Sequence, residues 1–93
     1  MTYELAFVNA ALKEWRKLDS NTRDQFKKKL AERLANPRAP SAKLSGSADR
    51  YKIKLRSSGY RLVYEVRDDQ LVVVVLAVGK REREAVYKAA EKR

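Results

Sequence analysis

The sequence contains no cysteine and no histidine. Disulfide bonds, Cys/His zinc sites, thiol nucleophiles and imidazole acid–base pairs are therefore excluded. It also lacks a long apolar run: the longest, LVVVVLAV at 71–78, is too short to span a bilayer. The opening stretch MTYELAFVNA has no basic leader followed by an apolar segment, so we expect no signal peptide. These absences predict a cytoplasmic protein without a metal, a cofactor or a membrane partner.

Acidic residues are scarce relative to basic ones. Asp and Glu number 12 against 22 Lys and Arg, which gives a formal net charge of +10. Such an excess favours a polyanionic partner: nucleic acid first, and an anionic membrane or an acidic protein next. A basic surface that is merely solvated is the alternative. With 93 residues, 44% of them hydrophobic, the chain suffices for a single domain spanning residues 1–93.

Hydrophobic spacing divides the chain into seven elements in the order β-α-α-β-β-β-α. We expect strands at about 2–8, 50–56, 60–67 and 71–78, helices at about 10–18 and 22–35, and a last helix within 80–93. The short connections predict a single α+β domain: an antiparallel sheet of about four strands, with an N-terminal helical hairpin packed on one face. The run at 71–78 is apolar throughout, which indicates a central strand covered on both faces and ended by Gly79.

Three cations alternate with apolar residues in YKIKLR at 51–56. Because successive side chains of a strand point to opposite faces, Lys52, Lys54 and Arg56 stand on one face. The backbones of Lys52 and Lys54 lie about 7 Å apart, so their charges repel unless an anion neutralises them. If the register permits, Arg61 on the next strand projects beside them.

Two more cations and an aromatic residue follow the central strand. Lys80 and Arg81 come directly after Gly79, and Tyr87 lies in the last predicted helix. Cations can hold a phosphodiester and neutralise the charge that develops as phosphorus becomes five-coordinate, and an aromatic ring can stack on an unpaired base. The other interpretation is an edge strand with solvated cations and a tyrosine at the rim of the core.

Several stretches together resemble the RelE-type toxins of bacterial toxin–antitoxin pairs. They are ALKEWRKL at 11–18, Leu44 and Gly46 in the loop, YKIKLR at 51–56, GYRLVY at 59–64, VGKR at 78–81 and Tyr87. The looser Gly-x-Tyr-Arg pattern alone would indicate only the broader RelE/ParE superfamily, which includes gyrase-directed toxins. The chain departs from the pattern at Ser45, where a basic residue is often found, and at its charged C-terminal end.

The resemblance implies a compact fold similar to small microbial ribonucleases. It also implies a toxin that enters the ribosomal A site, beside 16S rRNA, and cuts the mRNA codon there. A cognate antitoxin would wrap and block it, and operator DNA would be reached only through that antitoxin. The family's functional positions match Lys52, Lys54, Arg61, Arg81 and Tyr87. We further expect Arg56, Lys80 and Arg83 to contact RNA or the ribosome.

The reaction implied is metal-independent attack of an RNA 2′-hydroxyl on the adjacent phosphate, leaving a 2′,3′-cyclic phosphate and a 5′-hydroxyl. Lys54 or Lys52 is the candidate base, if its neighbours depress its pKa. Tyr87 would stack on the base or share in proton transfer, and Arg61 would stabilise the equatorial oxygens. Arg81 would stabilise the leaving group, because guanidinium holds its proton too tightly for easy transfer, although proton donation stays open.

Two other functions compete with this hypothesis. A non-enzymatic basic module could bind DNA gyrase or another acidic partner. A nuclease of free RNA is disfavoured by the missing His–Glu pair. Without histidine, we expect cleavage to depend on the ribosome, which would hold the codon in line for attack.

Overall fold

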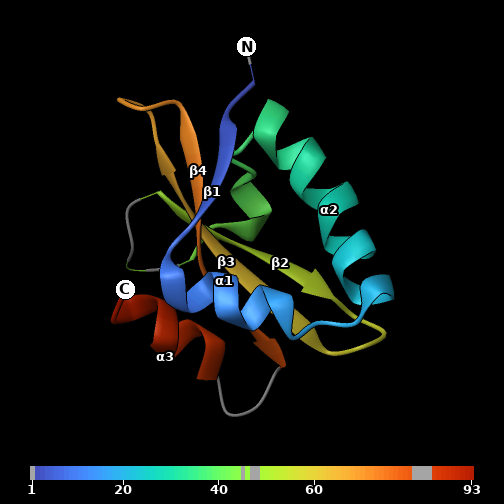
Figure 1. Ribbon diagram of the computed structural model, residues 1–93. Helices are drawn as coiled ribbons and strands as arrows, with labels where there is room; N and C mark the ends of the chain where they lie inside the picture. The colour runs from blue at the N-terminus through green and yellow to red at the C-terminus, as the bar shows by residue number, and fades with distance from the viewer. Residues whose placement is uncertain (1, 45, 47–48, 81–84) are drawn as a thin grey trace.

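The computed structural model describes residues 2–44, 46, 49–80 and 85–93 and shows an α+β fold (Figure 1). Its elements are β1 (Glu4–Phe7), α1 (Asn9–Arg16), α2 (Ser20–Ala35), the 3₁₀ turn η1 (Pro40–Ala42), β2 (Arg50–Leu55), β3 (Tyr60–Arg67), β4 (Val72–Lys80) and α3 (Ala85–Glu91). The predicted order of strands and α-helices is confirmed. The prediction that Gly79 ends its strand is wrong, because β4 continues through this glycine to Lys80.

The four strands form one sheet in the order β1-β4-β3-β2. Strands β2, β3 and β4 make the predicted antiparallel meander, whereas β1 pairs parallel with β4. The sheet is therefore mixed, and the prediction of an entirely antiparallel sheet is wrong. Tight turns impose antiparallel pairing on the meander, but no hairpin turn links β1 to β4, so nothing local sets their relative direction.

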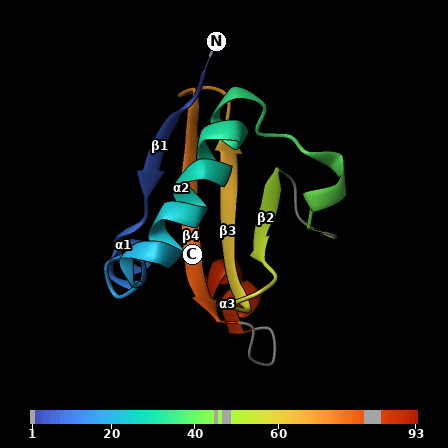
Figure 2. The same ribbon diagram turned by 90° about the vertical axis from the view of Figure 1, so that its right-hand side faces the viewer.

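Helices cover both faces of the sheet (Figures 1 and 2). The predicted pair α1 and α2 packs on one face, and α3 covers part of the other. Buried on the first face are Phe26, Leu30, Ile53, Leu62, Tyr64, Val73 and Val75, and on the second Val63, Val74, Leu76, Ala77, Val86 and Ala90. Strand β4 contributes to both sets, which confirms the prediction of a central strand covered on both sides. No helix in the described ranges combines the length and the apolar character needed to cross a membrane.

A β-bulge in β4 changes the face on which its last residues lie. Tyr64 is paired with Val75 and Val63 with Ala77, so Leu76 is the extra residue. Leu76 and Ala77 consequently both pack in the cluster beneath α3, and the alternation of faces reverses there.

Because the alternation reverses, Gly79 lies on the sheet face that α3 covers. It is paired with Arg61, while the next residue, Lys80, is paired with Tyr60. A Cβ atom at Gly79 would lie 3.1 Å from Cγ2 of Val86, which is tighter than ordinary van der Waals contact. The missing side chain therefore lets the start of α3 approach the end of the sheet.

Candidate active site

Three cations gather at one end of the sheet face that carries α3. Lys54 and Arg61 are direct cross-strand partners, and Lys52 is paired with Val63, two residues away on each strand. Directly opposed residues in such a ladder have Cβ atoms about 5 Å apart. The register therefore brings Arg61 beside the two lysines, as the alternation predicts. We call Lys52, Lys54 and Arg61 the cation cluster.

Arg61 is the buried member of the cation cluster, with 7% of its surface exposed. Its Nη1 donates a hydrogen bond to the carbonyl oxygen of Tyr60 at 3.1 Å. Among the side chains that the structure describes, no carboxylate forms an ion pair with any member of the cluster. A buried cation without an acidic partner is costly, so this place favours an anion.

The crowding acts on the ammonium group of Lys54. The charge of Lys52 lowers the pKa of Lys54 most, and partial desolvation and the charges of Arg61 and Arg56 add to the effect. The Lys54 side chain is exposed, so it can meet a substrate. Its amine therefore loses a proton more readily than an ordinary lysine, which is what a general base requires.

Replacing Lys54 by Gln should make the fold more stable at neutral pH. Because the pKa of Lys54 in the folded protein lies below its ordinary value of 10.5, the unfolded chain binds this proton more tightly. The resulting cost to stability is full below the lowered pKa and disappears as pH rises through 10.5. Urea unfolding at neutral pH and near pH 10.5 should thus show a gain for Lys54→Gln that shrinks with pH. Lys28→Gln on α2 is the control, and a loss of stability in Lys54→Gln at neutral pH would contradict the crowding.

Tyr87 lies on α3, half-buried at the rim of the cluster that contains Val63 and Leu76. Val86 and Ala90 point toward the sheet. At about 100° per residue, Tyr87 and Ala89 then project from opposite flanks of the helix. Arg93, two residues beyond the end of α3, reaches the edge of β4 on the β1 side, and we infer that the flank of Ala89 faces that edge. Tyr87 therefore projects toward β3 and β2, where the cation cluster lies.

The other predicted site residues fall in different places. Arg56 is exposed in the turn after β2, and its charge contributes to the lowered pKa of Lys54. Lys80 lies on the α1–α2 face, with its Nζ 5.6 Å from the centre of the Tyr60 ring, because the bulge has reversed the alternation. Arg81 and Arg83 lie outside the described residues.

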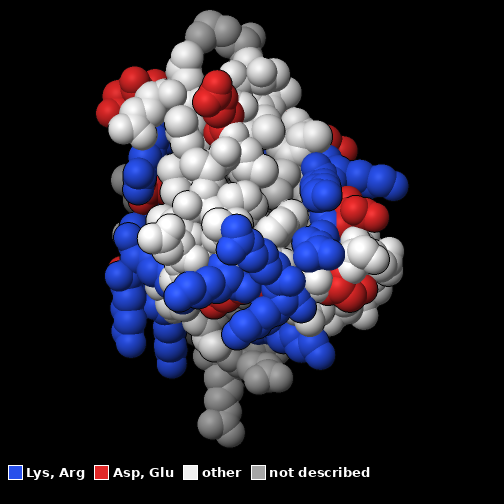
Figure 3. All heavy atoms as spheres, in the orientation of Figure 1, with Lys and Arg blue, Asp and Glu red and all other residues white. Residues whose placement is uncertain are grey.

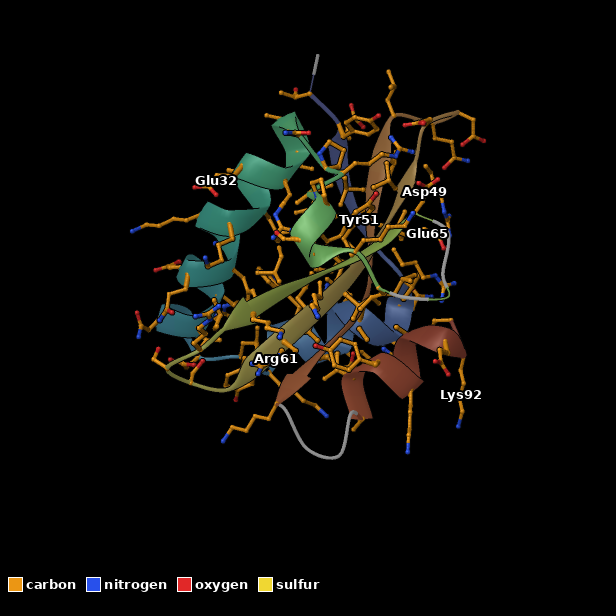
Figure 4. The ribbon with its side chains drawn as sticks, turned by 180° about the vertical axis from the view of Figure 1, so that it is seen from behind. Glu32, Asp49, Tyr51, Arg61, Glu65 and Lys92 are labelled. Carbon is orange, nitrogen blue, oxygen red and sulfur yellow. The ribbon has the colours of Figure 1, made fainter. Side chains whose placement is uncertain are left out.

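Arg50 and Glu65 are site neighbours that the sequence reasoning missed. They are cross-strand partners at the opposite end of the same face, where Nε of Arg50 lies 3.0 Å from Glu65. Burial raises the pKa of Glu65, but hydrogen bonds from Arg67 and Arg50 outweigh it and hold this pKa below its usual value. The face thus has a neutralised end at Glu65 and a cationic end at Arg61 (Figure 4). Strand alternation could have predicted that Arg50 lies on the same face as Lys52 and Lys54, because positions 50, 52 and 54 are two residues apart.

Positive charge also extends over a second surface. Figure 3 shows Lys and Arg side chains gathered over the lower part of the face seen in Figure 1, where α1 lies. Helix α1 carries Lys13 and Arg16, and Lys17 follows it. In the described part of the chain, no group of three or more acidic side chains is arranged to hold a metal ion.

Comparison with known proteins finds toxins that are similar to this chain. A family model described as the ParE toxin of the type II toxin–antitoxin system parDE matches residues 5–85. The "mRNA interferase toxin RelE" of Escherichia coli strain K12 is 61% identical over 93 residues, which are 100% of this chain and 98% of that protein.

Solved structures agree with the sequence comparison. A mutant of E. coli toxin RelE in the free state has a TM-score of 0.93 and 59% identity, covering 100% of this chain and 98% of the other. A chain of the intact E. coli RelBE toxin–antitoxin complex has a TM-score of 0.84 and 62% identity, covering 87% of this chain and 99% of that one. The resemblance stated from the motifs is confirmed.

Proposed function

This chain belongs to the ParE toxin family of type II toxin–antitoxin systems and is a RelE-type member of it, and on that premise we propose that it is an endoribonuclease that cuts mRNA in the ribosomal A site. Its relative in E. coli is named an mRNA interferase, and full-length identity of 61% supports the same activity here. The proposal places the protein in the cytoplasm, where ribosomes translate.

The observation that carries this function is the cation cluster. Lys52, Lys54 and Arg61 are held together by strand register, and the described residues supply no acidic partner for them. A phosphodiester supplies the missing negative charge, and more of it develops as phosphorus becomes five-coordinate. A surface that only bound an acidic protein would not need to bury one of its cations.

Each side chain has a role in the proposed reaction. Lys54, with its lowered pKa, takes the proton from the 2′-hydroxyl as this oxygen attacks the adjacent phosphate. Arg61 stabilises the equatorial oxygens, and Lys52 adds positive charge and helps to keep the pKa of Lys54 low. Tyr87 stacks on an unpaired base. Arg81 stabilises the leaving 5′-oxygen, which takes a proton from a water molecule as the bond to phosphorus breaks.

Binding to the ribosome would use a further set of cations outside the cluster. Arg56 beside the cluster, Arg83, and Lys80 on the opposite face would contact RNA backbone. The basic surface over α1 offers further phosphate contacts. A complex of this extent positions the codon, so little cutting of free RNA is expected.

We also infer a cognate antitoxin as partner. The RelE chain that resembles this one occurs in a complex with the antitoxin RelB, and the present chain matches 99% of it. A small antitoxin with an acidic surface would complement the net charge of +10. Contact with operator DNA would then occur only through the antitoxin.

Primer extension on programmed ribosomes tests the proposed function. The protein should produce new mRNA 5′ ends within the A-site codon, and the same mRNA without ribosomes should stay intact. Lys54→Ala should remove the cuts without unfolding the protein, because an exposed lysine contributes little to stability. Lys28→Ala on α2 is the matched control and should cut normally.

Intact A-site codons with the unaltered protein would overturn the enzyme proposal. Inhibition of DNA gyrase in the same preparation would then support the non-enzymatic alternative within the same superfamily.

A further inference from the structure

Helix α3 is tied to the rest of the fold by two arginines near its C-terminal end. Arg50 reaches it from β2, and Arg93, at the end of the chain, reaches from it to β4 and α1. We call these contacts the Arg50 clamp and the Arg93 clamp. Neither arginine belongs to the cation cluster.

The Arg50 clamp joins the sheet to the end of α3. Nη1 of Arg50 donates to the carbonyl oxygen of Ala90 at 3.2 Å, while its Nε pairs with Glu65 at 3.0 Å. A cation at a helix C-terminus interacts favourably with the unpaired carbonyls there. The ion pair with Glu65 orients the guanidinium of Arg50, so that its Nη1 faces the carbonyl oxygen of Ala90.

The Arg93 clamp occupies an edge that the sheet leaves open. Strand β1 ends at Phe7, opposite Val75, so within the described residues the backbone groups of β4 beyond that point pair with no strand on this side. Glu14 of α1 accepts a hydrogen bond from the Val78 N–H at 3.1 Å. Nη1 of Arg93 donates to the carbonyl oxygen of Leu76 at 2.9 Å and to Glu14 at 2.8 Å. The Arg93–Glu14 ion pair therefore satisfies backbone groups at this edge of β4 and attaches Arg93 to β4 and α1.

Helix α3 needs such anchors because it is short. Over the described residues it spans seven, Ala85–Glu91, and a helix of this length is not stable in water by itself. The side chains that it buries against the sheet are small, namely Val86 and Ala90. The two clamps hold it from opposite sides and add to the packing of Val86 and Ala90.

We propose that Arg50, aimed by Glu65, and Arg93, aimed by Glu14, are positioning residues that hold the Tyr87 ring beside the cation cluster. The predicted effect on kcat rests on the proposed ribonuclease function, whereas the predicted position of α3 does not. The clamps touch neither the substrate nor the reacting atoms. They act through the helix that carries Tyr87.

A double-mutant cycle measures whether Arg93 acts through Tyr87. Arg93→Ala should lower kcat for cutting on programmed ribosomes by roughly tenfold to a hundredfold and leave KM nearly unchanged. The same substitution in a Tyr87→Ala background should cause little further loss, because the group being positioned is gone. Arg93→Lys should recover part of the rate, and Lys92→Ala, at an exposed neighbouring position, should behave like the parent.

Hydrogen exchange of backbone amides provides a test that does not need activity. In Arg50→Ala and in Arg93→Ala, the amides of residues 88–92 should exchange faster, while those of β3 and β4 should not. Protection of α3 that is unchanged in both variants would overturn the inference even if the parent cuts mRNA.

The kinetic cycle can overturn the inference independently. If Arg93→Ala lowers kcat by the same factor in the parent and in Tyr87→Ala, then Arg93 does not act through the tyrosine ring. If the parent does not cut at all, the proposed function fails, and amide exchange alone decides whether the clamps hold α3.

Discussion

Arg61→Met should abolish most mRNA cutting while leaving the protein folded. Arg61 is 7% exposed, lies directly opposite Lys54, and is the buried member of the cluster that we propose binds phosphate. Removing one group that stabilises charge in a transition state typically costs a factor of about 10² to 10³ in rate. Primer extension with quantified single-turnover rates on programmed ribosomes measures the loss.

The thermal midpoint separates this effect from unfolding. Methionine replaces a buried charge with an apolar chain of similar length, so Arg61→Met should melt at the same temperature or higher. Arg61→Lys keeps the charge but loses the planar fork of donors, so its rate should lie between those of Arg61→Met and the parent. A variant that melts much earlier than the parent would show that the guanidinium is structural, and full activity would remove Arg61 from the site.

Leu76→Asp should prevent the domain from folding. Leu76 is fully buried, at 0% exposure, and it is the extra residue of the bulge in β4 beneath α3. A carboxylate there loses its hydration without gaining a partner, at a cost of several kcal/mol. A domain of this size is stable by only about 5 to 15 kcal/mol in total. Circular dichroism during heating should show no cooperative transition.

The same charge on the surface provides the matched comparison. Leu5 on β1 is 38% exposed, so Leu5→Asp should shift the melting temperature only slightly. A normal melting curve for Leu76→Asp would mean that β4 does not lie in the interior of the sheet. Early melting of Leu5→Asp would mean instead that the edge strand is more important to stability than its exposure indicates.

Local patterns were sufficient for most of the elements. Alternation in YKIKLR predicted both β2 and the face of its lysines, because strand periodicity is a property of neighbouring residues. The apolar run in β4 predicted burial on both faces for the same reason. The direction of β1 was predicted wrongly, since it depends on a pairing between distant parts of the chain.

The candidate site was predictable to a similar extent. Their basic side chains and the alternation of faces along a strand identified Lys52, Lys54 and Arg61. The register of the structure then placed Arg61 directly opposite Lys54. The face of Lys80 could not be found in this way, because a bulge is a mismatch between two paired strands and leaves no clear mark on either one alone. The contact of Arg50 with Ala90 was also out of reach, because it joins residues 40 positions apart.

By itself, then, the sequence determined which side chains were available for the chemistry: a chain without histidine or cysteine, with 22 basic residues, offers Lys and Arg as the main candidates for contact with phosphate. Only the tertiary structure decided which of those cations share a surface, which of them an acidic neighbour neutralises, and how the helix carrying Tyr87 is held. The reason is physical. Charge and periodicity are properties of single residues and their neighbours, whereas strand register, bulges and ion pairs exist only between segments that folding brings together.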